Sequence, residues 1–270
     1  MAERNLLLRT ASALVAIPLL FALVLWHEPL GFAGLVLLGI AIGLGEFAQL
    51  TLGGQARRAR VALVVLGCGF STAIYLRPDR AFVFAIAVIV LVALEVLASS
   101  PSDLPAATQR LAMSVFGIFY VGGLLTALPL LRRDLDHGAW WVIAVFVVTF
   151  ANDTGAYFAG RALGRHKLAP TISPGKTVEG AVGGLLAGIG VLLAYRALFF
   201  GQLRIVDAVV IGAVAGVLGP AGDLMESTFK RAAGAKDSGR LIPGHGGMLD
   251  RIDALLFIGA YVFIHTHLFR

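Results

Sequence analysis

The sequence predicts an all-α polytopic membrane protein, with about nine transmembrane helices in one bundle and a cytoplasmic N-terminus. Of its 270 residues, 58% are hydrophobic and only 14% are charged, whereas soluble proteins are about half apolar and about a quarter charged. The mean hydropathy is +0.87. Apolar runs close to the length of about 20 residues that crosses a bilayer recur along the whole chain.

The apolar runs give the individual helices in order. They cover residues 8–26, 30–50, 61–76, 81–98, 111–131, 139–158, 180–200, 205–229 and 252–269. The third run is short, which suits a tilted or partly interfacial helix. Arg4 precedes the first run and Arg9 lies at its beginning, as in a signal peptide, but no small-residue cleavage site follows the run. We therefore expect a retained first helix.

The positive charges orient these helices. A cytoplasmic N-terminus places 15 of the 22 Lys and Arg residues in cytoplasmic segments and 7 outside, in agreement with the positive-inside rule. The early loop at residues 57–60 shows this bias independently of any binding site. The formal net charge of +6 follows this distribution and does not indicate nucleic-acid binding. The single cysteine, Cys68, excludes an intramolecular disulfide.

We expect one integral membrane domain over residues 1–270. Residues 1–135 form mainly apolar helices, and residues 140–260 carry nearly all the chemistry. Small residues repeat at four-residue spacing, which lets helix backbones pack closely; they are Gly39/Gly43, Gly180/Gly184/Gly188 and Gly212/Gly216. Packing within one bundle is the simpler interpretation of these glycines, and a homodimer face is the alternative.

The first polar segment covers residues 152–180. It begins with Asp153 inside the sixth apolar run and continues through a basic stretch to Ser173-Pro-Gly-Lys176-Thr177. The pattern of a P-loop is absent. We interpret this stretch as a Pro/Gly-rich turn before a helix N-terminus, which is a favourable place for an anion. A solvated basic loop with ordinary helix capping is the alternative.

The second polar segment covers residues 223–253. Its charged residues lie at or near the ends of two apolar runs; they include Asp223, Glu226, Lys230, Arg231, Lys236, Asp237, Arg240, Asp250, Arg251 and Asp253. Ionisable residues at membrane depth are costly and usually mark a functional site. Carboxylates bind hard divalent cations, and Lys and Arg bind phosphates. The combination indicates a membrane-embedded site for a metal–phosphate substrate.

The second segment also resembles a known family signature. It reads Ser227-x-Phe229-Lys230-Arg231-x4-Lys236-Asp237-x-Gly239-x2-Ile242-Pro243-x-His245-Gly246-Gly247-Met248-x-Asp250-Arg251-Ile252-Asp253. This pattern is similar to that of the phosphatidate cytidylyltransferases, or CDP-diacylglycerol synthases, and the resemblance covers about residues 140–260. It implies a reaction of CTP with phosphatidic acid that gives CDP-diacylglycerol and pyrophosphate with Mg²⁺. A second, monovalent cation such as K⁺ is a further candidate.

The resemblance, together with position in the chain, assigns candidate roles. Asp223 and Asp250 are the first candidates for metal ligands, followed by Asp253 and Asp153. The candidates for phosphate binding are Lys176, Lys230, Arg231, Lys236 and Arg251, with Asp237 also at the substrate. Ser173, Thr177 and His245 are candidates to orient the phosphates. His245 is equally open to a role as general acid or to a structural role between glycines.

Two other functions fit parts of the sequence. A CTP-dependent lipid kinase, acting on a polyprenol-type alcohol, would transfer the γ-phosphate and would need a base. A cation-coupled transporter would use Asp153, Glu46 and Glu95 as relay groups, but the carboxylates concentrate at one membrane face. We interpret Glu46 and Glu95 as span-end or helix–helix contacts. Asp207 is expected at an outer span edge, with little effect when neutralised.

Overall fold

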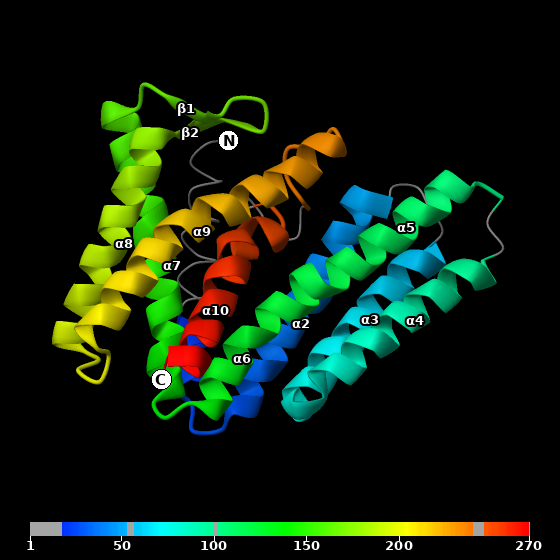
Figure 1. Ribbon diagram of the computed structural model, residues 1–270, viewed down its shortest axis with the longest axis horizontal. Coiled ribbons are helices and arrows are strands. Elements are labelled where there is room, and N and C mark those ends of the chain that lie inside the picture. Colours follow the sequence, from blue (N-terminus) through cyan, green and yellow to red (C-terminus); the bar gives the residue numbers. More distant parts are fainter. Residues whose placement is uncertain (1–17, 53–56, 100–101, 240–245, 270) are drawn as a thin grey trace. The chain divides into compact units, whose positions relative to one another are not determined.

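The structure, a computed structural model, describes residues 18–52, 57–99, 102–239 and 246–269 (Figure 1). Its elements follow the chain as α2 (Pro29–Leu52), α3 (Arg57–Leu76), η1 (Pro78–Arg80), α4 (Ala81–Ala98), α5 (Leu104–Gly117), η2 (Ile118–Gly123), α6 (Leu124–Asp134), α7 (Gly138–Leu163), β1 (Lys167–Ala169), β2 (Ser173–Thr177), α8 (Val178–Leu198), α9 (Ile205–Ala232) and α10 (Leu249–Phe269). The 3₁₀ turn η1 precedes α4, and the π-helical segment η2 joins α5 to α6.

Eight helices in the described part of the chain are long and apolar enough to cross a membrane. They correspond to the second to ninth apolar runs, so the helical membrane fold is confirmed. Residues 8–17 of the first run lie outside the described residues, and the count of nine stays a prediction. Helix α7 extends beyond the predicted end at 158, and α10 begins before the predicted start at 252. Hydropathy marks only the apolar part of a helix, whereas polar residues continue its backbone into the interface.

The structure groups the chain into two compact units. Unit 1 comprises Met1–Leu130 and Ala232–Asp250, and unit 2 comprises Leu131–Arg231 and Arg251–Arg270. The first boundary lies near the predicted division at residue 135, but the segment at 232–250 packs with the earlier helices. That the whole chain forms one bundle stays a prediction.

Unit 1 has an apolar interior between α2, α3 and η2. Phe32, Phe47 and Ile118 are fully buried there. A Cβ on Gly122 of η2 would lie only 3.2 Å from the Gly67 carbonyl oxygen of α3, so the two backbones meet closely. Helix α4, in contrast, leaves large apolar side chains such as Phe82 exposed, as expected for a surface that faces lipid.

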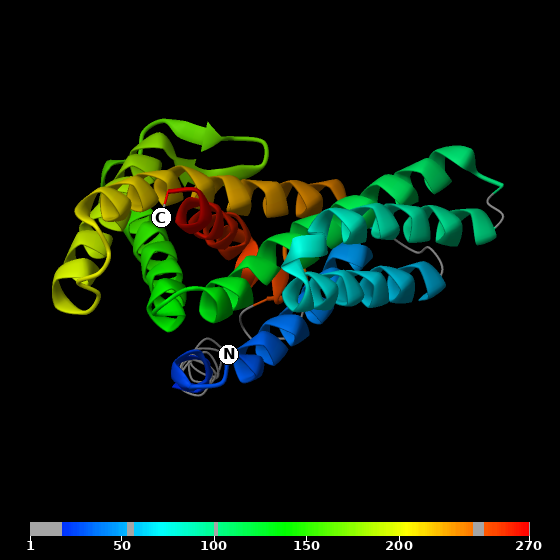
Figure 2. The ribbon, with the colours of Figure 1, turned by 60° about the horizontal axis from the view of Figure 1, so that its bottom comes forward.

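Unit 2 is held together by glycine contacts between its helices. Helices α7 and α8 run side by side (Figures 1 and 2), and a Cβ on Gly183 of α8 would lie 2.2 Å from the Ala159 Cβ of α7. A Cβ on Gly212 of α9 would lie 2.7 Å from the Ile189 Cα of α8. Larger residues at these positions would separate the helices. These glycines therefore serve packing within the chain, and the homodimer alternative stays untested.

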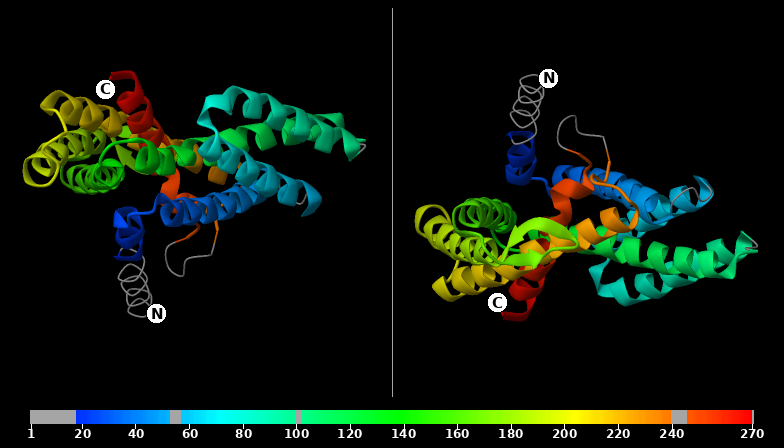
Figure 3. Two further views of the ribbon diagram at one scale, coloured as in Figure 1. Left: turned by 90° about the horizontal axis from the view of Figure 1, so that it is seen from below. Right: turned by 90° about the horizontal axis from the view of Figure 1, so that it is seen from above.

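A short antiparallel hairpin, β1–β2, connects α7 to α8, where the sequence analysis expected only a turn. Lys167 pairs with Thr177 and Ala169 with Ser173. The Arg231 Nε near the end of α9 donates to the Ile172 carbonyl at 3.3 Å, and the right-hand view of Figure 3 shows the hairpin beside that end of α9. The described part of the chain is thus mainly helical, with a small β element that positions the Ser-Pro-Gly-Lys-Thr stretch.

Candidate functional site

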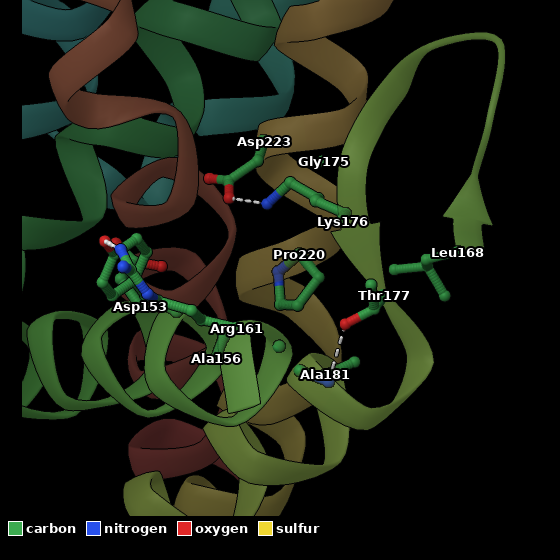
Figure 4. A pocket seen from close by; sticks show the side chains of 13 residues that line it. Asp153, Ala156, Arg161, Leu168, Gly175, Lys176, Thr177, Ala181, Pro220 and Asp223 are labelled. Carbon is green, nitrogen blue, oxygen red and sulfur yellow. Dashed lines mark hydrogen bonds and ion pairs between the residues drawn. The ribbon is translucent and has the colours of Figure 1, made fainter. Parts of the chain in front are cut away.

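A cavity of about 490 Å³ lies within unit 2, between α7, the hairpin, α8 and α9 (Figure 4). Charged and polar side chains share its lining with apolar and glycine residues; the lining includes Asp153, Tyr157, Arg161, Leu168, Lys176, Thr177, Pro220 and Asp223. Both polar segments of the sequence contribute to it. The cavity therefore places acidic and basic groups together among membrane helices.

The closest charge pair in the cavity joins the two segments. The Lys176 Nζ on β2 forms an ion pair with the Asp223 Oδ2 on α9 (Figure 4). The side chains are 28% and 20% exposed, so the pair is partly shielded from solvent yet open to the cavity. A ligand phosphate could exchange with the carboxylate as the partner of this ammonium group.

The second acidic residue of the cavity, Asp153, is fixed by its neighbour in the sequence. The buried Asn152 Nδ2 donates to the Ala215 carbonyl of α9 at 2.8 Å. A Cβ on Gly219 would lie 2.5 Å from the same Nδ2, so α9 approaches the amide closely. This contact holds α7 against α9. Asp153 then lies on the cavity wall with Arg161, which is two turns further along α7.

Helix capping positions the basic stretch at the cavity. The Thr177 Oγ1 accepts a hydrogen bond from the Gly180 amide at 3.1 Å and so caps α8. Glu179 in the first turn accepts from the backbone amides of Arg165 and His166 at 3.1 and 3.2 Å. These contacts fix both ends of the hairpin. Ser173 is half-buried at the start of β2 and is not among the residues that line the cavity.

A close crossing of α9 and α10 brings further charges to Asp223. A Cβ on Gly222 would lie 2.5 Å from the Asp253 carbonyl oxygen, which places Asp253 beside Asp223. The two carboxyl groups interact directly. Asp153 interacts electrostatically with Asp223, Lys176 and Arg251. Three predicted metal ligands therefore gather with two predicted phosphate-binding residues.

The carboxylates fit a hard divalent cation in chemistry, because oxygen is the ligand that Mg²⁺ prefers. Asp223 repels both Asp153 and Asp253 electrostatically, and an added positive charge would relieve this repulsion. Within the described ranges, no group of three or more His, Cys, Asp or Glu side chains is already arranged to hold a metal ion. The carboxylate oxygens that could bind Mg²⁺ are present, and that they bind an ion stays a prediction.

Two predicted phosphate-binding residues at the end of α9 have partners within the chain. Lys230 forms an ion pair with Glu226, whose side chain is 1% exposed. Arg231 contacts the hairpin through Ile172. Neither lines the cavity. In this structure, both residues support the position of α9 and the hairpin.

The remaining candidates lie on the segment at 232–250 in unit 1. Lys236 and Asp237 line a separate cavity of about 610 Å³ together with Gln49 of α2. The Asp250 Oδ2 accepts hydrogen bonds from the Ser238 amide at 2.9 Å and the Ser238 Oγ at 2.8 Å. Asp250 thus connects the start of α10 to Ser238, which lies twelve residues earlier in the chain. His245 lies outside the described residues.

Two carboxylates outside the cavity, Glu46 and Asp207, have partners that the sequence did not reveal. Glu46 of α2 is buried and accepts hydrogen bonds from Ser238, Met248 and Leu249, the last of which begins α10. This agrees with the expected helix–helix contact, although the sequence did not reveal the partner. Asp207 is 1% exposed and pairs with Arg204 at 2.7 Å and with His265 at 3.1 Å. Asp207 lies in the first turn of α9, at a span edge as expected, but it is buried and paired, and the effect of neutralising it stays a prediction. In both cases the only signal was a lone carboxylate at or within an apolar run, which does not reveal its partner.

The fold and cavity define a membrane-integral protein with a mixed acidic and basic site at its helix ends. A family model described as "Cytidylyltransferase family" matches residues 7–269. A phosphatidate cytidylyltransferase of Brucella suis is 36% identical over 271 residues, covering 98% of this chain and 94% of that protein. One of Haemophilus influenzae is 43% identical over 150 residues, covering 53% of this chain and 51% of that protein. The chain belongs to the cytidylyltransferase family, which confirms the family predicted from its signature.

Proposed function

We propose that this protein transfers the cytidylyl group of CTP to phosphatidic acid and forms CDP-diacylglycerol and pyrophosphate. The observation that carries the proposal is the cavity in which Lys176 and Arg161 face Asp153 and Asp223 between membrane helices. A polyanionic nucleotide needs such cations, and a lipid needs a site that its headgroup reaches from the bilayer. The relatives' name, phosphatidate cytidylyltransferase, supports the same reaction.

The reaction is an in-line displacement at phosphorus. A phosphate oxygen of phosphatidic acid attacks the α-phosphorus of CTP, the new P–O bond forms, and the bond to the β-phosphate oxygen breaks. Pyrophosphate leaves with the bonding electrons. Because the attacking phosphate is already anionic, the step needs no strong general base. The protein's main task is to bring two polyanions together.

The basic residues would perform that task. Lys176 would leave Asp223 to contact a phosphate group, and Arg161 and Arg251 would add positive charge nearby. Such contacts lower the repulsion between the substrates and stabilise charge that develops on pyrophosphate. Lys230, Arg231, Lys236, Asp237, Ser173, Thr177 and His245 remain candidates for substrate contacts.

Mg²⁺ is the expected cofactor. Asp223, with Asp253 and Asp153 beside it, supplies the oxygen donors that the ion prefers. When bound, the ion would neutralise charge on the transferring phosphoryl group. Asp250 remains a candidate ligand from the sequence, and K⁺ remains a candidate second ion.

The protein is an integral membrane protein, and we propose a bacterial cytoplasmic membrane with the site facing the cytoplasm. The site residues lie in the C-terminal halves of α7 and α9 and near the N-terminal ends of α8 and α10, which supports a site nearer to one membrane face. The positive charge bias assigns that face to the cytoplasm. CTP is available on that side.

Product analysis tests this function. Purified protein in lipid nanodiscs is incubated with CTP, MgCl₂ and phosphatidic acid, and lipids and nucleotides are identified by mass spectrometry. CDP-diacylglycerol and pyrophosphate are expected, with turnover lost on addition of a chelator and restored by Mg²⁺. A phosphorylated alcohol with CDP, or turnover unaffected by the chelator, contradicts the proposal.

A further inference from the structure

Glu46 of α2 is a buried carboxylate that contacts the signature segment across a long stretch of sequence. It is 6% exposed. Its oxygens accept hydrogen bonds from the Ser238 Oγ at 3.0 Å, the Met248 amide at 3.0 Å and the Leu249 amide at 2.8 Å. Ser238 lies at the beginning of the segment, and Met248 and Leu249 lie at its end. One side chain therefore holds both ends.

The charge on Glu46 is balanced by these donors. No Lys or Arg forms an ion pair with it among the residues that the structure describes. The Met248 and Leu249 amides stand at the N-terminus of α10, where unpaired amides and the helix dipole favour an anion. Hydrogen bonds to an ionised acceptor are stronger than neutral ones. Glu46 thus caps a helix that is distant in sequence.

Two glycines of the signature leave room for this carboxylate. A Cβ on Gly239 would lie 2.3 Å from the Glu46 Oε1, and a Cβ on Gly247 would lie 2.4 Å from the Glu46 Oε2. A side chain at either position would displace the carboxylate. Glycine at positions 239 and 247 therefore gives the Glu46 carboxylate the space that it occupies, although Glu46 lies outside the signature.

A second carboxylate completes the same junction. The Asp250 Oδ2 accepts from the Ser238 amide, the Ser238 Oγ and the Gly247 amide at 2.8–2.9 Å. The Ser238 hydroxyl lies within hydrogen-bond distance of both Glu46 and Asp250, and its one proton is shared between them. We call the group Glu46, Ser238, Asp250 and the amides of Gly247, Met248 and Leu249 the loop junction.

We propose that Glu46 is a positioning residue for cytidylyl transfer, which acts by closing the loop junction. This inference rests on the proposed function. The junction fixes Lys236 and Asp237, which directly precede Ser238, and it fixes the start of α10, which carries Arg251 and Asp253. Glu46 itself is expected to contact neither substrate. Without it, Lys236 and Asp237 would lose their fixed position relative to Asp250 at the start of α10.

The test replaces Glu46 with glutamine and compares it with a matched variant. Glu46→Gln keeps the size but turns one acceptor into a donor, which then faces the N–H and O–H donors of the junction. Glu95→Gln is the control, because Glu95 is also a membrane-helix carboxylate and its ion pair, with Arg58, is 3.9 Å long. Each protein is assayed for CDP-diacylglycerol formation and for amide hydrogen exchange in nanodiscs.

We expect Glu46→Gln to lower kcat roughly 10–100-fold, by analogy with the loss of a hydrogen-bond partner that orients a metal ligand. Exchange should become faster in peptides covering 246–250 and stay unchanged in α7 and α8. Glu95→Gln should retain wild-type turnover and exchange. Near-wild-type turnover in Glu46→Gln, or unchanged exchange at 246–250, overturns the inference.

Two further measurements keep the inference testable if Glu46→Gln does not fold. Ser238→Ala removes the one hydroxyl donor that Glu46 and Asp250 share and should give a smaller loss of the same kind. In the wild-type protein, the Met248 and Leu249 amides should be protected from exchange; exchange at the rate of an unstructured peptide contradicts the junction. An inactive wild-type protein with protected amides would instead count against the proposed function alone.

Discussion

Replacing Asp223 with asparagine distinguishes a role of this carboxylate in catalysis from a role in the stability of the fold. The variant keeps the size of the side chain but removes the partner charge of Lys176 and one of three neighbouring carboxylates. Loss of an ion pair that is partly shielded destabilises the fold, while relief of repulsion from Asp153 and Asp253 stabilises it. We therefore expect the two effects to offset each other within about 1 kcal/mol of unfolding free energy.

Turnover should respond far more strongly than stability. An electrostatic group at a phosphoryl transition state contributes about 3–5 kcal/mol, so kcat should fall roughly 10²–10⁴-fold. The assay is CDP-diacylglycerol formation at saturating CTP, with thermal unfolding measured on the same samples. Asp136→Asn is the control, because Asp136 is exposed at the opposite end of the membrane helices. If Asp223→Asn keeps near-wild-type kcat and Mg²⁺ dependence, the role assigned to this carboxylate is wrong.

Three further predictions concern the orientation, the loop junction and the buried Asp207. In a cysteine-free background, a cysteine at Ala235 should be shielded from an impermeant outside reagent and one at Gln202 should react; the reverse pattern contradicts the orientation. Gly239→Ala alone should lower turnover, because its Cβ would clash with the Glu46 carboxylate. In a Glu46→Ala background the same substitution should lower turnover little further, because the carboxylate is gone; additive losses of turnover in the double variant would refute the contact. Asp207→Asn should lower the unfolding free energy by roughly 1–3 kcal/mol, because one buried acceptor for Arg204 and His265 is lost, and an unchanged melting temperature would contradict this.

The membrane helices were predictable because bilayer thickness imposes a length and an apolar composition that each segment shows by itself. The hairpin was not predictable in the same way. Its strands are three and five residues long, and one of them contains Pro and Gly. It is held by contacts from Glu179 and Arg231, and such contacts leave no periodic signal in the sequence.

The candidate site was predictable in its residue types but not in its partnerships. Asp223 and Lys176 stood out as charges beside apolar runs, yet their pairing across 47 residues is a property of the fold. Glu46 lies 192 residues from Ser238, and no local pattern connects them. A charged residue at membrane depth therefore indicates a structural or functional role from the sequence alone, whereas the structure is needed to identify its partner.

The most direct test of the central claim follows each phosphate of CTP. Purified protein is given phosphatidic acid and CTP labelled either in the α-phosphate or in the γ-phosphate. Transfer of a cytidylyl group predicts that the α-label enters the lipid and that the γ-label leaves as pyrophosphate. Recovery of the γ-label in the lipid, with the α-label remaining in CDP, would show a lipid kinase and contradict the account.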